Sequence, residues 1–578
     1  MKKRNRPQET KPQPDIVRKP GPAPKHDTWW MWVAGFASLV AVFQVYAPAL
    51  NGAFVLDDLY LPFLTDPAQS SAAIFHSSRP LLAVSFWADN RLQGNSDPFL
   101  FHATNVLLHF GVAVLAALIA AKLLEWANVT GKLRAALSVF SGALFLLHPV
   151  QTESVAYVAS RSENLSVLFY YAAFAVFLYR PGAEGDADRT RMTWLRAVAI
   201  VALFGAAVSS KEHALTLPVL LVATDYFWNR GGIRANRNLY ALLALAGIVG
   251  GLAVWSVLRH ADTAGFHVEG LTPATYFFTQ CRVIWTYIRM FFLPFRQNVD
   301  PDVAISGSLM EHGAILGLVA LIALAASAWI FRKRYPLAAF GFFLFLLLLA
   351  PTSSFIPIRD VQAEHRLYLP FLGLVLVCLE GLRRLRFSQV VWTGTIALAA
   401  CCVLTYQRNA VWAAPLDLWK DSVAKSPNKY RPRFQLAYAE YQDGKCEDAS
   451  RDFEAGSHLG SNDQVLLTDW ALALDCAGRW QEAIEKLKSS AALVDGSHVH
   501  TQLAMVYAKH GQTLAALAEL DTAEKLNPSN EMIHVYRGDI DLKGGDRAGA
   551  EREFRRALTL NPANRAARDG LVQAAAAR

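Results

Sequence analysis

Apolar segments of helix length recur between Trp29 and Tyr406, and they constrain the fold of this 578-residue chain more than any other feature. A helix needs about 20 apolar residues to cross a bilayer, so several of the segments are short, which favours a packed bundle. Overall, 53% of the residues are hydrophobic and only 18% are charged, which is too apolar for a soluble protein of this length. The segments lie at about 29–49, 103–124, 135–149, 164–180, 194–209, 214–228, 239–258, 313–331, 336–350, 366–382 and 389–406.

The pattern predicts an all-α membrane domain at 29–408, preceded by a tail at 1–28. The tail is basic and rich in proline, a composition that does not sustain a packed core, and we expect it to be disordered and cytoplasmic. No small-residue cleavage site follows the apolar segment at 29–47, so we expect that segment to stay as a membrane anchor. The net charge of +8 arises mostly from the tail and the loops, so it does not predict nucleic-acid binding.

Lysine and arginine gather in six short stretches, and such clusters mark the cytoplasmic loops of membrane proteins. All six fall on one side with about eleven crossings if the segment at 274–295 does not cross. In that segment Arg282 and Arg289 lie two helical turns apart on one face, which predicts an amphipathic helix at the interface. The N-terminus is then cytoplasmic and the C-terminus outside. The six stretches are Lys2–Lys25, Lys132/Arg134, Arg189/Arg191/Arg196, Arg230/Arg234/Arg237, Arg332/Lys333/Arg334 and Arg383/Arg384/Arg386.

This topology gathers at the outer surface the polar residues that neighbour apolar segments. A transporter is expected to place some ionisable groups at the membrane midplane, so the gathering favours an active site at the outer leaflet. The residues are Asp57, Asp58, Arg79, His102, His148, Glu153, Arg161, Glu163, Lys211, Glu212, His213, Arg282, Arg289, Asp300, Arg359, Glu364, His365, Arg366 and Tyr368.

The last 150 residues carry an internal repeat. Gly444, Gly478, Gly511 and Gly545 recur at spacings of 34, 33 and 34 residues, and an alanine follows each by five residues. Large apolar residues follow the alanines by four, and LNPSN and LNPAN end the last two units. This is the period and pattern of tetratricopeptide (TPR) repeats, which stack as pairs of helices into a solenoid. We therefore expect about four repeats at 429–578, with a concave groove that binds a peptide or protein; the alternative is a rigid lid or assembly surface without a peptide ligand.

Pro427 sits where the end of a preceding repeat would fall, so we expect 409–428 to be a half-repeat linking the two domains. Cys446 and Cys476 lie in adjacent repeats and are candidates for a disulfide in an oxidising compartment, although the sequence does not settle their geometry. The other four cysteines lie in or beside membrane helices as packing residues.

Two adjacent carboxylates, Asp57 and Asp58, follow the first apolar segment. Ionisable residues at a membrane edge are costly and are functional candidates. A carboxylate within hydrogen-bond reach of an acceptor hydroxyl can take its proton, and repulsion between neighbouring acids can raise the pKa of one of them. The alternative is that the pair caps a helix. Our preference for Asp58 over Asp57 as the base is slight.

Cationic side chains are needed to stabilise a departing phosphate, and several occur on the same predicted side. The candidates are Arg79, Lys211, Arg366, Arg282 and Arg289, with Glu212 and Glu364 beside two of them. Lys211 with Glu212, and Arg366 with Glu364, are alternatively simple ion pairs. His102, His148 and His365 show no metal-ligand spacing, so interfacial packing is their simpler role.

Four blocks of the chain resemble the transmembrane and TPR-repeat-containing O-mannosyltransferases of the GT-C superfamily. The resemblance also covers the order of the domains. The blocks are RPLLAVSFWADNRLQGNSDPFLFHATNVLLH (Arg79–His109), HPVQTESVAYVASRSENL (His148–Leu165), SSKEHALTLPVLLVATDYF (Ser209–Phe227) and EHRLYLPFLG (Glu364–Gly373).

The resemblance implies a polytopic GT-C-type helix bundle and an inverting transfer from a polyprenyl-phosphate sugar to a protein hydroxyl. It implies that Asp57 and Asp58 form the catalytic site. Donor phosphate or sugar binding is expected of Arg79, Lys211, Glu212, Glu364, Arg366, Arg282, Arg289 and His102. The block at Glu364 reads EHR where the family has ER, so the alignment of Glu364 and Arg366 with the family's two residues stays open. The array is also shorter than in animal members, so the acceptor protein and the sugar stay open.

No cofactor is expected, because the donor phosphodiester already stores the energy of transfer. The chain has DD rather than a DxD motif, so we expect no metal. Expected partners are the polyprenyl-phosphate donor, an acceptor protein in the repeat groove and membrane lipids, in a bacterial inner membrane with periplasmic repeats (or an ER membrane with lumenal repeats). The alternatives are a non-catalytic membrane-anchored TPR scaffold and a lipid-linked saccharide polymerase or transporter.

Overall fold

The computed structural model describes residues 29–61, 77, 79–93, 97–180, 192–228, 236–259, 263–460 and 462–576. Across these residues the chain is helical, and the only extended pairing is an isolated bridge between Ala264 and Ile358. The predicted all-α fold is confirmed. The expected tail at 1–28 and the basic residues Arg189, Arg191, Arg230 and Arg234 lie outside the described residues.

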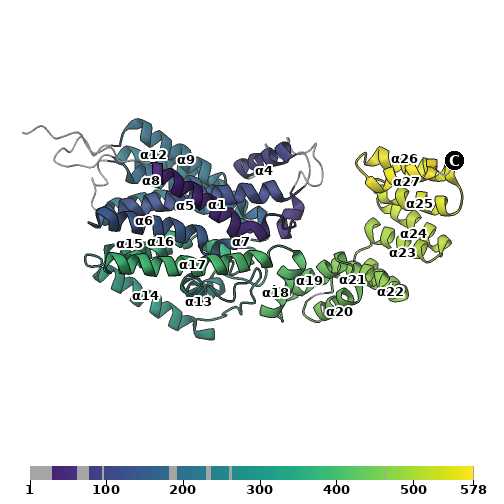
Figure 1. Ribbon diagram of the computed structural model, residues 1–578. Coiled ribbons are helices and arrows are strands. Elements are labelled where there is room, and N and C mark those ends of the chain that lie inside the picture. The colour runs from purple at the N-terminus through teal and green to yellow at the C-terminus, as the bar shows by residue number, and fades with distance from the viewer. Residues whose placement is uncertain are drawn as a thin grey trace, which may run out of the picture.

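The membrane domain is a bundle of long helices with short helical turns at its ends (Figure 1). Its α-helices are α1 (Trp29–Tyr46), α4 (Pro80–Gln93), α5 (Phe99–Trp126), α6 (Gly131–Leu147), α7 (Thr152–Ala156), α8 (Arg161–Leu178), α9 (Trp194–Val208), α10 (Leu217–Trp228), α12 (Arg237–Leu258), α13 (Pro273–Phe292), α14 (Ala314–Ile330), α15 (Pro336–Leu349), α16 (Phe371–Leu382) and α17 (Phe387–Val411). The short 3-10 turns are η1 (Ala47–Ala49), η2 (Leu56–Tyr60), η3 (Pro149–Gln151), η4 (Val158–Ser160), η5 (Glu212–Thr216), η6 (Glu311–Gly313) and η7 (Glu364–Leu367).

Apolar side chains from most of these helices form one continuous core. At its centre the rings of His109, Phe145, Tyr171 and Tyr368 pack edge-on or tilted against one another. The buried His109 ring finds polar partners within this core, as buried polar groups generally do: it contacts the Tyr368 hydroxyl at 2.8 Å and the Leu146 carbonyl at 3.1 Å. The bundle is therefore a packed protein core and not a set of isolated spans.

Several described helices are apolar enough to span a membrane, but their number does not test the predicted eleven crossings. Four are long enough as single helices: Phe99–Trp126, Arg237–Ser256, Glu311–Ile330 and Phe387–Val411. A fifth candidate is the pair Gly131–Leu147 and Pro149–Ala156, which is bent by 48°. Shorter apolar helices cover Gly35–Ala49, Trp194–Val208, Pro336–Leu349 and Phe371–Leu382. The helices fit a multi-pass membrane protein, and the exact number of crossings stays a prediction.

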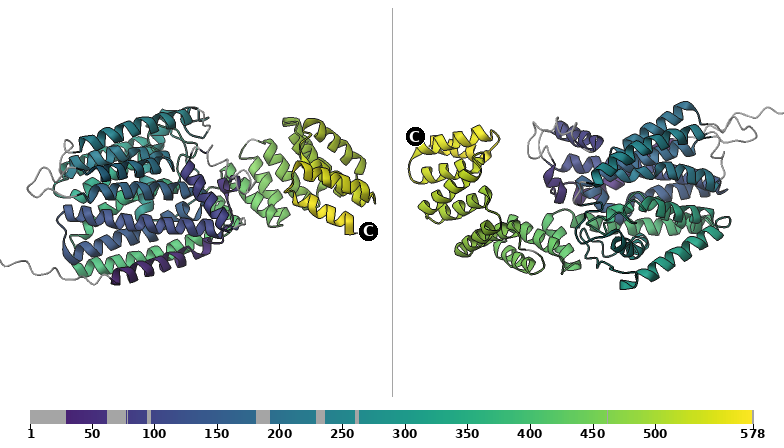
Figure 2. Two further views of the ribbon diagram at one scale, coloured as in Figure 1. Left: turned by 90° about the horizontal axis from the view of Figure 1, so that it is seen from above. Right: turned by 180° about the vertical axis from the view of Figure 1, so that it is seen from behind.

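One end of the bundle collects the ends of α1, α6 and α17, which are remote in sequence. The Asn409 amide donates to the Val45 carbonyl, and the Thr405 hydroxyl donates to the Leu147 carbonyl. The short turns η2, η3, η4, η5 and η7 and the candidate acid pair belong to this end. We call it the site end, and the repeat array projects from it (Figures 1 and 2).

The opposite end carries the predicted basic loops that the structure describes. The Arg383 guanidinium donates to the Ala127 carbonyl, and that of Arg384 donates to the Arg334 carbonyl. The prediction that these basic residues lie together at one end of the bundle, away from the acid pair, is therefore correct for the described residues. Which side of the membrane each end faces stays a prediction.

The segment predicted to lie at the interface forms α13, which is oriented differently from its neighbours. Figure 1 shows α13 nearly end-on, whereas α5, α6 and α17 lie lengthwise. A hydrogen bond of 3.0 Å from Trp285 Nε1 to the Gly317 carbonyl joins it to α14. Whether the segment at 274–295 crosses the membrane or lies at its interface stays a prediction.

The C-terminal domain consists of four helix pairs and a final helix. The pairs are α19 (Tyr430–Gln442) with α20 (Cys446–Ser457), α21 (Gln464–Cys476) with α22 (Trp480–Leu493), α23 (Ser497–Lys509) with α24 (Thr513–Leu526), and α25 (Glu531–Lys543) with α26 (Arg547–Leu560); α27 (Arg565–Ala576) follows. The four periodic glycines have φ between 74° and 86°, a region that favours glycine. The four periodic alanines, at 449, 483, 516 and 550, are fully buried between paired helices. The repeat prediction agrees with the observed pairs.

Cys446 and Cys476 form a disulfide between α20 and the end of α21. The remaining cysteines, Cys281, Cys378, Cys401 and Cys402, are free and lie in membrane-domain helices. Ahead of the first pair, the expected half-repeat is the helix α18 (Pro415–Lys425), with Pro415 at its first turn.

Candidate active site

The acid pair lies in η2, a short turn that leaves α1 and η1 at the site end. Val55 is extended, and Leu56 has a φ of 52°, which is rare for a residue with a Cβ. Asp57 is exposed and Asp58 is fully buried. The turn therefore directs its two carboxylates into different surroundings.

Asp58 holds the turn together. Its Oδ1 accepts the Ala159 N–H at 2.7 Å and its Oδ2 accepts the Val55 N–H at 3.3 Å. Burial raises the pKa of Asp58 to about 7, although these N–H groups favour the charged form. Asp58 therefore caps the turn, as the alternative interpretation of the acid pair expected. Its burial makes Asp58 a poorer candidate for the base than the sequence suggested.

Asp57 faces a cavity of about 130 Å³ whose walls come from five separate parts of the chain. Its own N–H donates to the Tyr157 hydroxyl at 3.0 Å. Besides Asp57, the charged or titratable lining residues are Glu153, Tyr157, Asp300, Asp360, His365 and Arg431. We call this space the acidic cavity. Asp57 is the member of the acid pair that a substrate can reach.

The bend after α6 brings Glu153 to the acidic cavity. Pro149 interrupts the helix, because proline lacks the N–H that the helix interior needs, and η3 and α7 follow at 48° to α6. Glu153 Oε1 then contacts His365 Nδ1 at 2.5 Å, while Oε2 accepts the Glu364 N–H at 3.1 Å. The HPVQTE and AEHR blocks, remote in sequence, thus meet at one wall.

The Lys-Glu block makes two ion pairs, and neither joins the two neighbours to each other. Lys211 Nζ contacts Glu163 at 2.5 Å, and Glu212 accepts two parallel bonds of 2.9 Å from the Arg79 guanidinium. Burial raises the pKa of Glu212, but the Arg79 guanidinium outweighs it and holds the pKa below its usual value. The alternative that Lys211 and Glu212 pair with one another is wrong.

These ion pairs connect to the acidic cavity through Glu163. Its electrostatic neighbours are Lys211, His213 and His365, and His365 lines the cavity. The structure therefore brings the cations Arg79 and Lys211 to the same end as Asp57, through one continuous polar network.

Arg366 and Glu364 are buried and bonded within the protein, and not to each other. The Arg366 guanidinium donates to Tyr276 Oη at 3.2 Å and to the Val361 carbonyl at 3.2 Å. Glu364 accepts the Asn298 N–H at 2.6 Å, and burial raises its pKa to about 7. These contacts give both residues a structural role at the wall of the site.

Three further predicted residues also lie apart from the acidic cavity. His102 Nε2 contacts the Gly52 carbonyl at 3.0 Å and is buried. Arg282 donates to the Ser306 hydroxyl at 3.1 Å, and Arg289 to the Phe295 carbonyl at 3.1 Å. Arg289 lines a separate polar cavity of about 370 Å³ with Arg296 and Lys425.

Two charged residues of the cavity, Asp360 and Arg431, are not among the candidates predicted from the sequence, whereas Asp300 is predicted to lie on the outer side. Asp300 is buried and accepts Lys429 Nζ at 2.6 Å and Arg431 Nε at 2.6 Å. Arg431 also contacts Asp360 at 2.8 Å. Lys429 and Arg431 stand at the start of the first repeat helix, so the only signal in the sequence was the position of charged residues beside the domain boundary.

Polar contacts along α18 fasten the repeat array to the 297–302 loop. The Ser422 hydroxyl donates to Asn298 Oδ1 at 2.7 Å, the Asn298 amide donates to the Ser426 hydroxyl at 2.8 Å, and Lys425 donates to the Gln297 carbonyl at 2.6 Å. The first repeat therefore has a defined position beside the acidic cavity. Within the described residues, no group of three or more His, Cys, Asp or Glu side chains is arranged to hold a metal ion.

Comparison with known proteins finds relatives over most of the chain. Protein O-mannosyl-transferase Tmtc3 of Drosophila melanogaster is 24% identical over 547 residues, covering 81% of this chain and 57% of that protein. TMTC3 of Homo sapiens is 22% identical over 554 residues, covering 84% and 58%. The predicted resemblance is confirmed. The chain spans less than two thirds of the length of these relatives, and no protein-family model matches it.

Mouse TMTC4 is 28% identical over 212 residues, covering 33% of this chain and 28% of that protein. Solved structures with some similarity include MamA (19% identity, TM-score 0.23, 25% of this chain and 86% of that one). The TPR protein YrrB has 15% identity and a TM-score of 0.23, over 30% of this chain and 89% of its own.

Proposed function

We propose that this chain is a protein O-glycosyltransferase that moves a sugar from a polyprenyl-phosphate donor to a serine or threonine hydroxyl. The observation that carries the proposal is the acidic cavity: the exposed Asp57 faces a space walled by the membrane domain and by the first repeat. The similarity to protein O-mannosyl-transferases over 81% of the chain supports the reaction class.

Asp57 is the proposed general base. As the acceptor oxygen attacks the anomeric carbon, its proton passes to the Asp57 carboxylate and a C–O glycosidic bond forms. The bond from the anomeric carbon to the phosphate oxygen breaks, and its electron pair leaves with the polyprenyl phosphate. Attack from the face opposite the leaving group inverts the anomeric centre. A positioned base of this kind contributes about 10²- to 10⁴-fold to a rate.

Asp58 is a positioning residue in this proposal. Its carboxylate binds the N–H groups of Val55 and Ala159, so it holds η2 against η4. Asp57 leaves η2 beside it, and the Tyr157 hydroxyl fixes the backbone of Asp57 from the same direction. A displaced turn would move the base away from the acceptor hydroxyl, and small misplacements are costly in catalysis.

Arg79 and Lys211 are the proposed phosphate ligands. Both are paired with carboxylates and partly exposed, with 35% and 18% of their side-chain surfaces accessible. A donor phosphate can replace a carboxylate at either cation, since the Arg79 guanidinium binds both groups in the same bidentate geometry and the Lys211 ammonium binds both as a point charge. The chemistry of this reaction requires no cofactor, and we propose that it proceeds without a metal.

We further propose that the site end faces the periplasm of a bacterial inner membrane. The dense basic loops at the opposite end support a cytoplasmic position for that end. The disulfide between Cys446 and Cys476 supports an oxidising compartment for the repeats. The repeat array would then bind the acceptor protein on the side where the donor is used.

Intact-glycoprotein mass spectrometry of a strain lacking the gene, compared with its parent, tests the proposed function. We expect a set of envelope proteins to lose a hexose on serine or threonine, and the wild-type gene but not the Asp57→Asn variant to restore it. Asp417, which is exposed on α18, offers a matched control: Asp417→Asn should restore modification fully. An unchanged glycoproteome in the deletion strain, or full rescue by Asp57→Asn, would contradict the proposal.

A further inference from the structure

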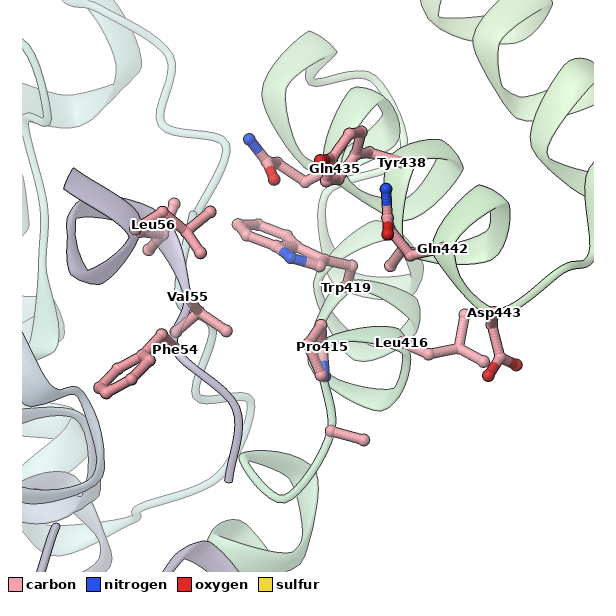
Figure 3. Close-up of a pocket in the computed structure, with 13 residues that line it drawn as sticks. Phe54, Val55, Leu56, Pro415, Leu416, Trp419, Gln435, Tyr438, Gln442 and Asp443 are labelled. Atoms are coloured by element: carbon pink, nitrogen blue, oxygen red, sulfur yellow. The ribbon is translucent and has the colours of Figure 1, made fainter. Parts of the chain in front are cut away.

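Another cavity, of about 370 Å³, lies between the first loop of the membrane domain and the first helices of the repeat array (Figure 3). It is distinct from the polar cavity lined by Arg289, and we call it the second cavity because it adjoins the acidic cavity. Phe54, Val55, Leu56 and Leu59 form one wall. The facing wall comes from α18 and α19. Its size is within the range of about 300–1,000 Å³ that ligand pockets occupy.

The second cavity adjoins the acidic cavity. Leu56 and Trp419 line both of them, and Leu56 directly precedes Asp57 in the chain. Figure 3 shows the Trp419 ring directed from α18 toward Leu56. A polypeptide seated in the second cavity therefore passes beside the proposed base.

The residues that line the second cavity can bind one apolar side chain of a peptide together with the neighbouring peptide backbone. The side chains of Leu59, Leu416 and Tyr438 are at least partly exposed and offer apolar surface to the cavity, which gains free energy by covering an apolar group. Gln435 and Gln442 reach into the space from α19. Their amides can both donate and accept, as the N–H and C=O groups of an extended peptide require.

Tyr438 connects the second cavity to the repeats. It lines the cavity, and its electrostatic neighbours are Tyr60 of η2 and Asp469 of α21 in the next repeat. A polypeptide that leaves the cavity past Tyr438 thus continues along the repeat array. This continuity distinguishes the cavity from an isolated surface pit.

The backbone of Leu56 shows that the junction is held in a specific shape. Its φ of 52° is unfavourable for leucine, and such conformations persist where surrounding contacts impose them. Leu56 packs both against the cluster of Val55, Tyr157 and Trp412 and against the cluster of Trp419 and Leu436. The side chain therefore ties the acid-pair turn to α18.

We propose that the second cavity is a specificity subsite for the acceptor, which binds an extended segment and takes a large apolar side chain near the modified serine or threonine. The occupant is the acceptor polypeptide, and the inference rests on the proposed function. Leu59 is the residue that tests it, because it is about half exposed and lines the cavity.

The first experiment measures transfer from polyprenyl-phosphate mannose to two peptide sets by the full-length protein in lipid nanodiscs. Each peptide has one central threonine, and the sets differ only in leucine or serine at the flanking positions. We expect the leucine peptides to have about tenfold lower KM, in line with the discrimination that apolar pockets achieve. Leu59→Glu should remove this difference in KM between the two peptide sets. Leu514→Glu, on the exposed surface of α24, should keep it.

The second experiment is independent of transfer. A photoreactive side chain is placed at Gln442, or at Gln512 as an exposed control, and irradiated with the leucine peptides. We expect cross-linking at Gln442 only. Transfer with the same peptide preference in Leu59→Glu, or without cross-linking at Gln442, overturns the subsite and leaves the proposed function standing. Cross-linking at Gln442 in a protein that transfers no sugar supports the peptide site and contradicts the proposed function.

Discussion

Arg79 and Glu212 are joined by two parallel hydrogen bonds of 2.9 Å across 133 positions of sequence. About a third of each side chain is exposed, and exposed pairs contribute only about 0.2–1 kcal/mol to folding. The geometry of this pair is the geometry in which arginine holds a phosphate. Substituting each member of this pair in turn therefore distinguishes a purely structural ion pair from a phosphate-binding arginine.

We expect Arg79→Gln to raise the KM for the polyprenyl-phosphate donor by about tenfold or more, the size of one charge-assisted contact. Glu212→Gln should change it by less than about threefold, since the phosphate takes the place of the carboxylate. Donor titrations of the purified variants measure both values. A purely structural ion pair would instead give equal losses in the two variants.

Asp58→Asn should flatten the dependence of stability on pH between about 4 and 7. The folded-state pKa of Asp58 is raised to about 7 by burial, so the native state binds more protons than the unfolded state in this window. The contribution of Asp58 is fully present below the unfolded pKa near 4 and is lost as pH rises through 7, by at most about 1.4 kcal/mol per pH unit.

Thermal unfolding of the wild type and of Asp58→Asn, in one detergent from pH 4 to 8, checks this expectation. Apart from a constant offset for the weaker bond that the amide makes to Val55, the two curves of melting temperature against pH should lie closest near pH 4, where the buried Asp58 is protonated and neutral like the amide, and the wild type should fall relative to the variant toward pH 8. Parallel curves over the whole range would show that Asp58 does not titrate there.

Asp300→Asn should loosen the repeat array. The buried carboxylate binds Lys429 and Arg431, and hydrogen bonds to charged groups contribute about 1.5–3 kcal/mol. Limited proteolysis should cut faster near 426–430, and acceptor modification should fall. Asp448→Asn, whose partner Arg451 lies on the surface, is the matched control and should behave as the wild type. Equal protease resistance in all three proteins would argue against a fastening role.

The repeats should depend on the bond between Cys446 and Cys476. A disulfide that closes a loop of this size stabilises by about 2–4 kcal/mol, and the sequence separation is 30 residues. Replacing both cysteines by serine should lower the melting temperature of the repeats and leave the membrane domain unaffected. Alkylation of the unreduced, denatured protein, followed by mass measurement, should modify four thiols; modification of six would contradict the bond.

A pair of cysteine substitutions should settle the orientation. Leu514 lies exposed in the repeats, and Lys333 lies exposed between α14 and α15 at the far end of the bundle. We expect a membrane-impermeant thiol reagent, added from the periplasmic side, to label Leu514→Cys in intact inner membranes. It should label Lys333→Cys only after the membrane is opened. The reverse pattern would refute the proposed topology.

The sequence alone determined the helical class, the repeats and the grouping of charges. The spacing of Gly444, Gly478, Gly511 and Gly545 predicted the turns of the repeats, where each glycine has a positive φ. Such features can be predicted from the sequence because they depend only on residues close together in the chain. The basic clusters likewise separated one end of the bundle from the other, because membrane crossings alternate along the chain.

Only the tertiary structure decided which carboxylate is accessible and which charges are paired. Asp57 and Asp58 are chemically identical neighbours, and contacts with residues about 100 positions away bury one and expose the other. The sequence pointed to Lys211 with Glu212 as one alternative, whereas folding joined Lys211 to Glu163 and Glu212 to Arg79. Such pairings depend on the long-range packing of η2, η4, η5 and α8, which no local pattern records, because burial and charge compensation are properties of the assembled core.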